Sequence, residues 1–139
     1  MTAAAQPGAA DFPVRKGEGP WTKAEIDDVR WRLSEEAAEL RAEIGRAESD
    51  IADRLGDSVS DAGDDQADLG AKAYEREHEL SLTYTARELL TQTERALERI
   101  ESGTYGLCES CGQPIGKARL QAFPRAMLCV SCKQREERR

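Results

Sequence analysis

"IDDVRWRLSEEAAELRAEIGRAESDI", residues 26–51, places apolar side chains at steps of three and four positions. This spacing puts them along one face of an α-helix and continues over several heptads. The other positions are mainly charged, which favours a coiled-coil arm over the alternative, an amphipathic helix in a globular core. The apolar seam consists of Ile26, Val29, Leu33, Ala37, Leu40, Ile44, Ala47 and Ile51.

The start of this helix is marked by a capping pattern. Thr22 is followed three residues later by Glu25, and Trp21 stands where a hydrophobic staple would pack. In such a capping box the two side chains bond each other's backbone N–H groups. The helical pattern then continues to about Leu55 and Gly56.

A second helical pattern follows. We expect it to begin between Asp64 and Asp68, because acids suit a helix N-terminus, and to end near Ser102 with Gly103 at the C′ position. Two helices joined by about ten residues form an antiparallel hairpin, each helix being roughly 50 Å long at 1.5 Å per residue. The apolar seam of the second helix is less regular: Leu69, Ala73, Leu80, Leu82, Ala86, Leu89, Leu90, Leu97 and Ile100.

The segment between the two helices is "DSVSDAGDDQADLG", residues 57–70. It contains five aspartates and no base, and a helical hairpin would place it at the far tip. It lacks the ligand spacing of an EF-hand and that motif's closing glutamate, so we expect no preformed calcium site. Its acids are therefore candidates for a functional tip.

Composition limits the class of protein. The chain has 139 residues, 39% hydrophobic and 34% charged, which fits one thin helical domain with an extension. A net charge of −7 argues against sequence-independent binding to nucleic acid and against binding to anionic membrane surfaces.

No apolar run reaches the roughly 20 residues of a membrane span. Residues 1–20 lack the apolar core of a signal peptide, and their composition suggests a disordered leader. We expect a cytoplasmic protein.

The cysteines form two close pairs. Cys108 and Cys111 are separated by two residues, as are Cys129 and Cys132, and 17 residues lie between the pairs. This spacing indicates a single zinc ion held by four thiolates, with Gly112 allowing the backbone to turn beneath it. Because the pairs fill all four tetrahedral positions, the zinc would be structural. Iron in a rubredoxin-like site and a thiol switch that releases zinc are the alternatives.

Two other residues are functional candidates by residue type. His78 is the only histidine and lies within the second helix with no nucleophile or second ligand nearby in sequence, so catalysis is not expected. Trp31 is interpreted as a packing residue of the first helix rather than a binding platform. We therefore expect a binding protein and not an enzyme.

The segments "CESCG" (108–112), "PIGKARLQAFP" (114–124) and "LCVSCK" (128–133), placed after a helical hairpin with an aspartate tip, resemble the DksA/TraR family. The resemblance covers about residue 22 to the end of the chain. It implies binding to bacterial RNA polymerase through the secondary channel of the largest subunit, with no sequence-specific binding to DNA. The tip acids of the family approach the polymerase active site and alter transcription initiation.

The resemblance also assigns individual residues. The Asp-x-x-Asp-x-Ala tip motif of the family falls on Asp65, Asp68 and Gly70. Glycine in place of alanine loosens the first turn of the helix by up to about 1 kcal/mol.

A second departure from the family concerns the alarmone ppGpp. Two bases of the family's ppGpp site correspond to Thr85 and Gln92, neither of which is basic, whereas Arg119 and Lys133 match other family bases as polymerase or alarmone contacts. Strong cooperation with ppGpp is therefore not expected.

The sequence thus predicts a mainly α-helical chain: a leader (1–20), a coiled-coil hairpin (21–103) and a four-cysteine zinc module (104–139) that ends in a short helix. The leading hypothesis is a monomeric secondary-channel regulator of RNA polymerase. The alternative is a zinc-ribbon coiled-coil adaptor that binds polymerase or another protein without a tip effect. A thiol-based response of the zinc site is compatible with both.

Overall fold

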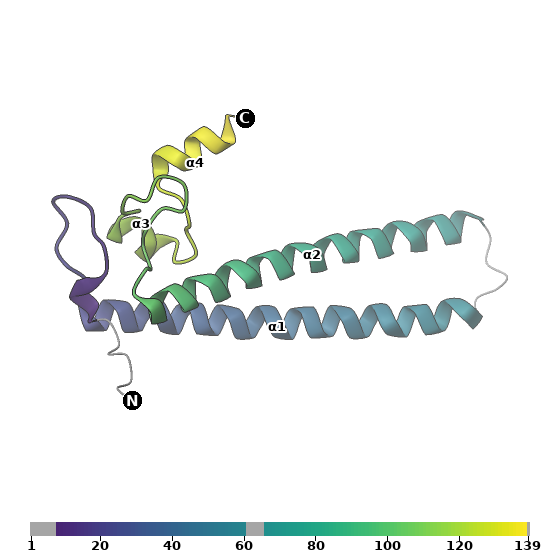
Figure 1. The fold of residues 1–139 in the computed structure, drawn as a ribbon. Helices are drawn as coiled ribbons and strands as arrows, with labels where there is room; N and C mark the ends of the chain where they lie inside the picture. The colour runs from purple at the N-terminus through teal and green to yellow at the C-terminus, as the bar shows by residue number, and fades with distance from the viewer. Residues whose placement is uncertain (1–7, 61–65, 139) are drawn as a thin grey trace. The chain divides into compact units, whose positions relative to one another are not determined.

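A computed structural model describes residues 8–60 and 66–138 of the chain. The predicted mainly α-helical fold is confirmed, with two long helices followed by a four-cysteine module and a short terminal helix (Figure 1). Within the described residues there is no strand, only an isolated bridge between Leu107 and Pro114. The elements in chain order are η1 (Ala9–Asp11), α1 (Lys23–Ser60), α2 (Gln66–Ser102), α3 (Lys117–Ala122) and α4 (Val130–Glu137).

The chain divides into two compact units. The first, here called the base unit, combines Met1–Glu36 with Gln92–Arg139, and the second, the arm unit, is Ala37–Thr91. In the part of the chain that the structure describes, no helix is long and apolar enough to cross a membrane.

Local signals set the helix ends in the base unit. The backbone N–H of Thr22 donates to Glu25 Oε1 at 3.0 Å, and the N–H of Glu25 donates to Thr22 Oγ1 at 3.2 Å, so the predicted capping box is confirmed. At the other end, α2 stops at Ser102 and Gly103 adopts a φ of 80°. This left-handed conformation closes the helix and confirms Gly103 as the C′ residue.

The ends of the helices in the arm unit differ in part from the prediction. Helix α1 continues to Ser60 instead of ending near Leu55 and Gly56. A single glycine costs a helix only about 1 kcal/mol, and residues 56–60 contain no proline. Helix α2 begins at Gln66, within the expected interval. The remaining segment, 61–65, lies outside the described residues.

The core of the base unit surrounds Tyr105. The ring of Tyr105 meets Phe12 edge-to-face at 6.5 Å between centroids and lies 6.2 Å from the ring of Trp21. Its hydroxyl donates to the carbonyl of Pro124 at 2.9 Å, which satisfies the one polar atom of this buried side chain. The two long helices contribute Ile26, Val29, Leu33, Ala96 and Ile100, and the cysteine module contributes Ile115 and Leu120.

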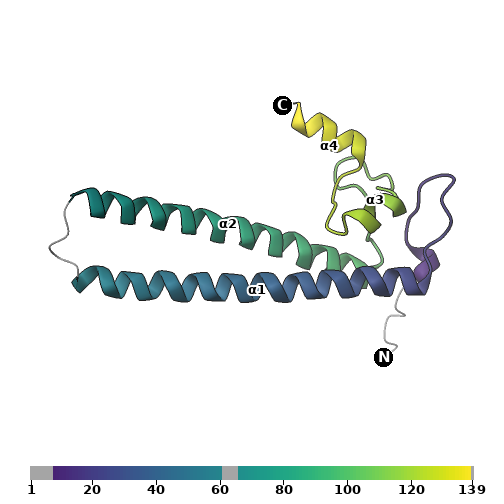
Figure 2. The same cartoon turned by 180° about the vertical axis from the view of Figure 1, so that it is seen from behind.

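The segment 8–20 differs from the expected disordered leader. Phe12 is 3% exposed and belongs to the core, and the indole of Trp21 donates to the carbonyl of Pro13 at 3.3 Å. Glu18 accepts hydrogen bonds from the backbone of α3. Burial of Phe12 favours order in this segment, which we call the N-terminal strap (Figure 2). Residues 1–7 lie outside the described part.

The predicted seam of α1 is confirmed in both units. Ile26, Val29 and Leu33 are buried in the base unit, and Ala37 and Leu40 continue the buried row in the arm unit. Ile44, Ala47 and Ile51 are half-buried further along the same row.

The predicted seam of α2 is wrong over the first half of that helix. Leu69, Leu80 and Leu82 are each about half exposed, and Ala73 is exposed. A regular alternation of three and four steps counted back from Ile100 gives the row that faces inward. Within the arm unit this row is fully or partly buried and consists of Arg76, Glu79, Thr83, Ala86 and Leu90, and in the base unit it continues through Thr93 and Leu97.

Trp31 is also placed differently from the prediction. Its side chain is 63% exposed, whereas Val29 and Leu33 are buried. Residues two apart in a helix do not share a face, so the neighbours of Trp31 that enter the core direct its own ring to solvent.

Candidate metal centre

The four cysteines of the base unit converge on one point. The Sγ atoms of Cys108, Cys111, Cys129 and Cys132 all lie within 4.8 Å of one another. A tetrahedral zinc ion with bonds of 2.3 Å requires sulfur atoms about 3.8 Å apart, and Cys111 Sγ lies 3.8 Å from Cys129 Sγ. The donor set and its size therefore fit a zinc ion.

The first pair of cysteines lies in a tight turn. The backbone N–H of Gly112 donates to the carbonyl of Cys108 at 3.0 Å, and the backbone N–H of Cys108 donates to the carbonyl of Gln113 at 2.9 Å. Gly112 has a φ of 74°, which a residue with a Cβ rarely adopts, so the expected role of this glycine in the turn is confirmed.

The second pair is positioned by α4. Cys129 is the N-cap residue and Cys132 lies in the first turn of the helix. The N–H of Glu109 donates to the carbonyl of Met127 at 2.9 Å, which joins the segment of the first pair to the segment of the second. The two pairs are thus held together by backbone as well as by any shared ion.

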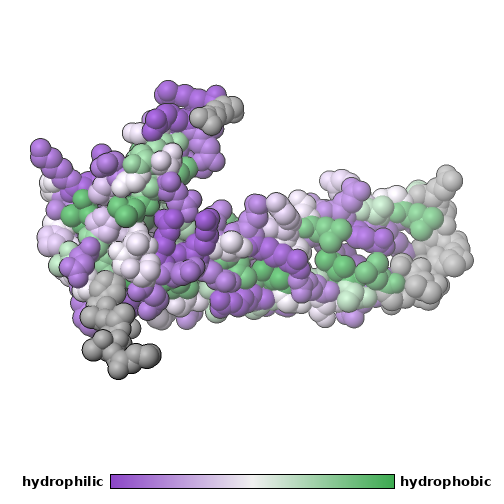
Figure 3. Space-filling model, in the orientation of Figure 1, coloured by the Kyte–Doolittle hydropathy of each residue, from purple (hydrophilic) through white to green (hydrophobic). Residues whose placement is uncertain are grey.

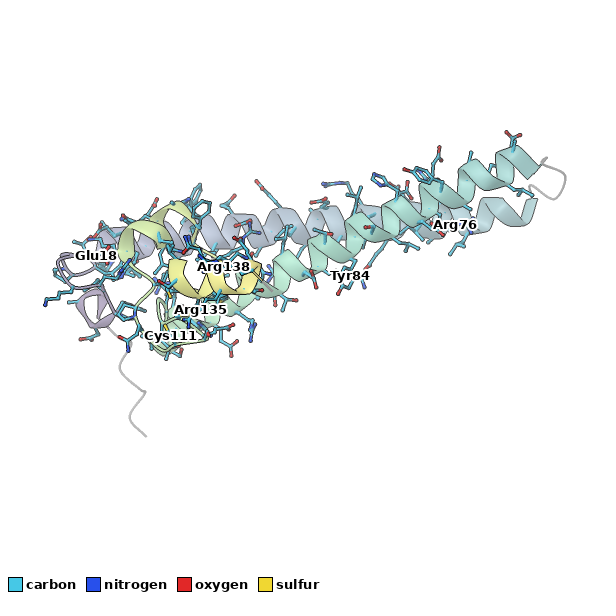
Figure 4. The ribbon with its side chains drawn as sticks, turned by 90° about the horizontal axis from the view of Figure 1, so that it is seen from above. Glu18, Arg76, Tyr84, Cys111, Arg135 and Arg138 are labelled. Carbon is cyan, nitrogen blue, oxygen red and sulfur yellow. The ribbon has the colours of Figure 1, made fainter. Side chains whose placement is uncertain are left out.

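Electrostatics act differently on the two cysteines of the first pair, because hydrogen bonds with the neighbouring cysteine thiols raise the pKa of Cys111 to about 11. Burial raises the pKa of Cys108, but hydrogen bonds from the backbone of Cys111, Cys129 and Ser110 outweigh it and lower the pKa to about 6. The guanidinium of Arg135 approaches Cys132 Sγ at 3.1 Å (Figure 4 labels Arg135 and Cys111). Four thiolates around one zinc ion carry a net negative charge, which Arg135 partly offsets.

Solvent reaches one side of the site. Cys108 and Cys132 are buried, whereas Cys111 is exposed. An open cavity of about 530 Å³ adjoins Cys111 and Cys129 and is bordered by Arg15, Lys16 and Arg135. A chelator or an oxidant can therefore approach the cysteines from this side.

The two predicted basic contacts have different surroundings. Arg119 donates through Nε to the carbonyl of Leu128 at 3.2 Å, and its guanidinium lies 5.9 Å from the ring centre of Phe123. Lys133 is exposed on α4. Arg119 thus has a packing role within the module, and Lys133 is available to a partner.

The predicted tip residues lie partly in the described region. Asp68 is exposed in the first turn of α2, and a methyl group added to Gly70 would meet nothing within 4 Å. Asp65 lies outside the described residues. The surroundings of Gly70 therefore offer no steric reason for glycine in place of the family's alanine.

Several residues that support the site are not predicted by the sequence patterns. Phe12 and Glu18 tie the N-terminal strap to the module, and Arg135 contacts a ligand sulfur. The packing of this segment could have been predicted from Phe12 and Val14, since apolar residues within a polar leader indicate burial.

Comparison with known proteins agrees with this geometry. Residues 103–138 match the family model described as the prokaryotic dksA/traR C4-type zinc finger. The chain is 31% identical over 126 residues to the RNA polymerase-binding transcription factor DksA of Escherichia coli, covering 91% of this chain and 80% of the relative. It is 43% identical over 75 residues to the DksA protein of Caulobacter vibrioides, so this match spans about half of that relative's length (53%) and 54% of this chain.

Among solved structures, the chain is also similar to proteins named as transcription factors or regulators of this kind. The structure of transcription factor DksA2 from Pseudomonas aeruginosa matches with a TM-score of 0.67 and 34% identity, covering 84% of this chain and 85% of that one. The RNA polymerase binding protein and transcriptional regulator Dks from Chlamydia trachomatis matches with a TM-score of 0.51 and 28% identity, covering 86% and 94%. The chain belongs to the DksA/TraR family.

Proposed function

We propose that this chain binds bacterial RNA polymerase and regulates transcription initiation. The observation that carries the proposal is the combination, in one chain, of a helical pair and a four-cysteine centre. Similarity to relatives named as RNA polymerase-binding transcription factors supports it. On this proposal the protein acts by binding and is not an enzyme.

The proposed route is the secondary channel in the largest subunit of the polymerase. The tip would approach the active site with Asp65 and Asp68, and the exposure of Asp68 at the start of α2 supports this assignment. The excess of acids over bases, 27 against 20, suits contact with protein rather than with the DNA backbone. We therefore propose no direct sequence-specific DNA binding.

The zinc centre would hold one structural ion, bound by all four cysteines. Residues Thr85 and Gln92 provide no charge for ppGpp, so we propose at most weak cooperation with it, through Arg119 and Lys133. The protein would act as a cytoplasmic monomer.

Promoter-specific transcription in vitro with purified polymerase tests the proposal. We expect the wild-type protein to change transcript yield and the Asp65→Asn/Asp68→Asn variant to lose that effect while still binding. The matched control is Asp28→Asn/Asp53→Asn, which alters two exposed aspartates of α1 and should behave as wild type. An active tip variant contradicts the tip mechanism, and absence of binding contradicts the proposed function.

A second candidate is an adaptor that binds polymerase or another protein without the tip effect. The observation favouring it is Gly70, the fifth residue of α2, where glycine is less favourable in a helix than alanine. Affinity purification from cell lysate followed by mass spectrometry separates the candidates by whether polymerase subunits are the main partner. The exposed Cys111 favours an added thiol response, which unchanged zinc content and activity after mild peroxide treatment would exclude.

A further inference from the structure

The arm unit exposes an unusual amount of apolar surface. Of the nine large hydrophobic side chains exposed among the described residues, six belong to this unit: Leu55, Leu69, Tyr74, Leu80, Leu82 and Tyr84. Figure 3 shows hydrophobic surface along α1 and α2 here. Single exposed apolar residues are common, but a concentration of them indicates an interaction surface.

This surface includes two grooves between α1 and α2 within the arm unit. The first, which we call the Leu82 groove, has a volume of about 140 Å³ and apolar walls formed by Ile44, Ala47, Leu82 and Ala86. The second is lined by other side chains, including Leu80 and Tyr84, and the two grooves share only Thr83. The grooves therefore provide two distinct surfaces, each with apolar side chains in its walls.

Charge distinguishes the two grooves. The Leu82 groove is bordered by the carboxylates of Glu43, Asp50 and Glu79 and by no base. In the second groove, Glu48 forms an ion pair with Arg87, so the local charges cancel. Only the Leu82 groove combines apolar walls with uncompensated negative charge at its edge.

The described neighbours leave part of this negative charge unpaired. Glu79 Oε1 pairs with Arg54, but Glu79 Oε2 is buried and has no hydrogen-bond partner among the described residues. Glu43 and Asp50 are exposed and form no ion pair with a described base. A buried acceptor without a partner costs free energy, which a donor from a bound protein would recover.

We propose that the Leu82 groove binds a lysine or arginine side chain of the RNA polymerase, flanked by an apolar residue. A long basic side chain can lay its methylene stem against Leu82 and Ile44 and direct its charge to the carboxylates at the edge. The small volume admits one side chain rather than a helix. This inference rests on the proposed function and adds to it the chemistry of one contact.

The test is the affinity of purified full-length protein for purified RNA polymerase. The Glu43→Lys/Asp50→Lys variant reverses the charge at the groove. The matched control, Asp53→Lys/Glu77→Lys, changes the same residue types and the net charge by the same amount at exposed positions outside both grooves. Because the groove variant loses two ion pairs, we expect its affinity for polymerase to be about tenfold weaker than that of wild type. The affinity of the control variant should be unchanged.

A second pair of variants tests the apolar walls. Leu82 is 54% exposed and Leu80 is 50% exposed, so serine at either position has a similar effect on the free chain. We expect Leu82→Ser to weaken polymerase binding several-fold more than Leu80→Ser. This comparison also replaces the charge-reversal test if Glu43→Lys/Asp50→Lys does not fold.

The outcomes are distinguishable. If wild type, groove variants and controls bind polymerase equally, or if controls lose as much affinity as groove variants, the Leu82 groove proposal is overturned and the proposed function stands. If the wild-type protein does not bind polymerase, both proposals are overturned.

Discussion

Glu18 and Lys117 are 99 residues apart in sequence, yet a carboxylate oxygen of Glu18 accepts a hydrogen bond from the backbone N–H of Lys117 at 3.0 Å. The second oxygen accepts from the N–H of Ala118 at 3.2 Å. These donors belong to the first turn of α3, whose N-cap residue Gly116 provides no side chain. The N-terminal strap therefore supplies the cap that the cysteine module lacks.

The first prediction concerns this cap. Glu18→Ala leaves two backbone N–H groups of α3 without their acceptor, so we expect the free energy of unfolding to fall by about 1–2 kcal/mol. Chemical denaturation followed by circular dichroism measures it. Glu35→Ala, which removes an exposed carboxylate of α1, is the control and should change stability by less than about 0.5 kcal/mol. Equal stability of the two variants contradicts a capping role for Glu18.

The second prediction concerns burial in the N-terminal strap. Phe12 is 3% exposed and Phe123 is 63% exposed, so the same substitution probes both environments. We expect Phe12→Ala to lower the free energy of unfolding by about 3–4 kcal/mol, because it leaves a cavity beside Tyr105. Phe123→Ala should lower it by less than about 1 kcal/mol, since it loses mainly the contact with Arg119. Similar losses would show that the strap does not contribute to the core.

The third prediction concerns acid sensitivity. The ion pair with Lys117, at 2.6 Å, is the main cause that lowers the pKa of Glu25 to about 2, assisted by the N–H of Thr22. A folded-state pKa below the unfolded value means that stabilisation is fully present above about pH 4.5 and is lost as the pH falls towards 2.

Thermal unfolding of wild type and Glu25→Gln at several pH values tests this relationship. Wild type should be the more stable near pH 6, and the difference in melting temperature should shrink steadily between pH 4.5 and 2. Loss of zinc at low pH affects both proteins, so the difference isolates Glu25. A difference that does not depend on pH contradicts the prediction.

The two long helices show how far sequence patterns determine this fold. In α1 the apolar residues follow one row at steps of three and four, and the structure places that row inward. In the first half of α2 the most apolar residues and the inward row do not coincide. The register is set by the regular spacing back from Ile100, which brings Thr83 inward and leaves Leu82 half exposed. In that half of the helix, hydrophobicity alone therefore selects the wrong face, whereas strict periodicity selects the inward one.

The metal centre was predictable because its signal is local. Two short cysteine pairs need only a turn each, and their spacing is independent of the rest of the fold. The contribution of Phe12 and Glu18 was not predictable in the same way, because it depends on contacts with residues about a hundred positions away. Long-range packing of that kind leaves only a weak trace in the sequence.

The fourth prediction concerns zinc removal. We expect one zinc ion per chain by elemental analysis, and loss of it on treatment with a chelator, which reaches the site beside Cys111. Helices α3 and α4 contain 6 and 8 residues, against 38 and 37 in α1 and α2. Far-UV circular dichroism should therefore lose only a minor part of its helical signal, because the strap and the long helices keep a core around Tyr105. Loss of most of the signal would show that the whole base unit depends on zinc.

The last prediction concerns Thr83, a polar residue in the inward row of α2. Thr83 is 7% exposed, and its hydroxyl donates to the carbonyl of Glu79 at 2.9 Å, one turn earlier in the same helix. Such a bond within a helix adds little stability, whereas valine has a similar shape and gains from burial. We expect Thr83→Val to raise the free energy of unfolding of the arm unit by about 0.5–1 kcal/mol. Slower hydrogen exchange of backbone amides in residues 75–91 would report the change locally.

Thr85 provides the matched control for this substitution. Its hydroxyl makes the equivalent bond to the carbonyl of Ser81 at 3.1 Å, but the side chain is exposed. Thr85→Val removes the same type of hydrogen bond without burying a methyl group, so we expect its effect to be within about 0.5 kcal/mol of zero. If Thr83→Val destabilises the arm unit while Thr85→Val does not, the buried hydroxyl of Thr83 contributes to the stability of the arm unit, and the prediction is wrong.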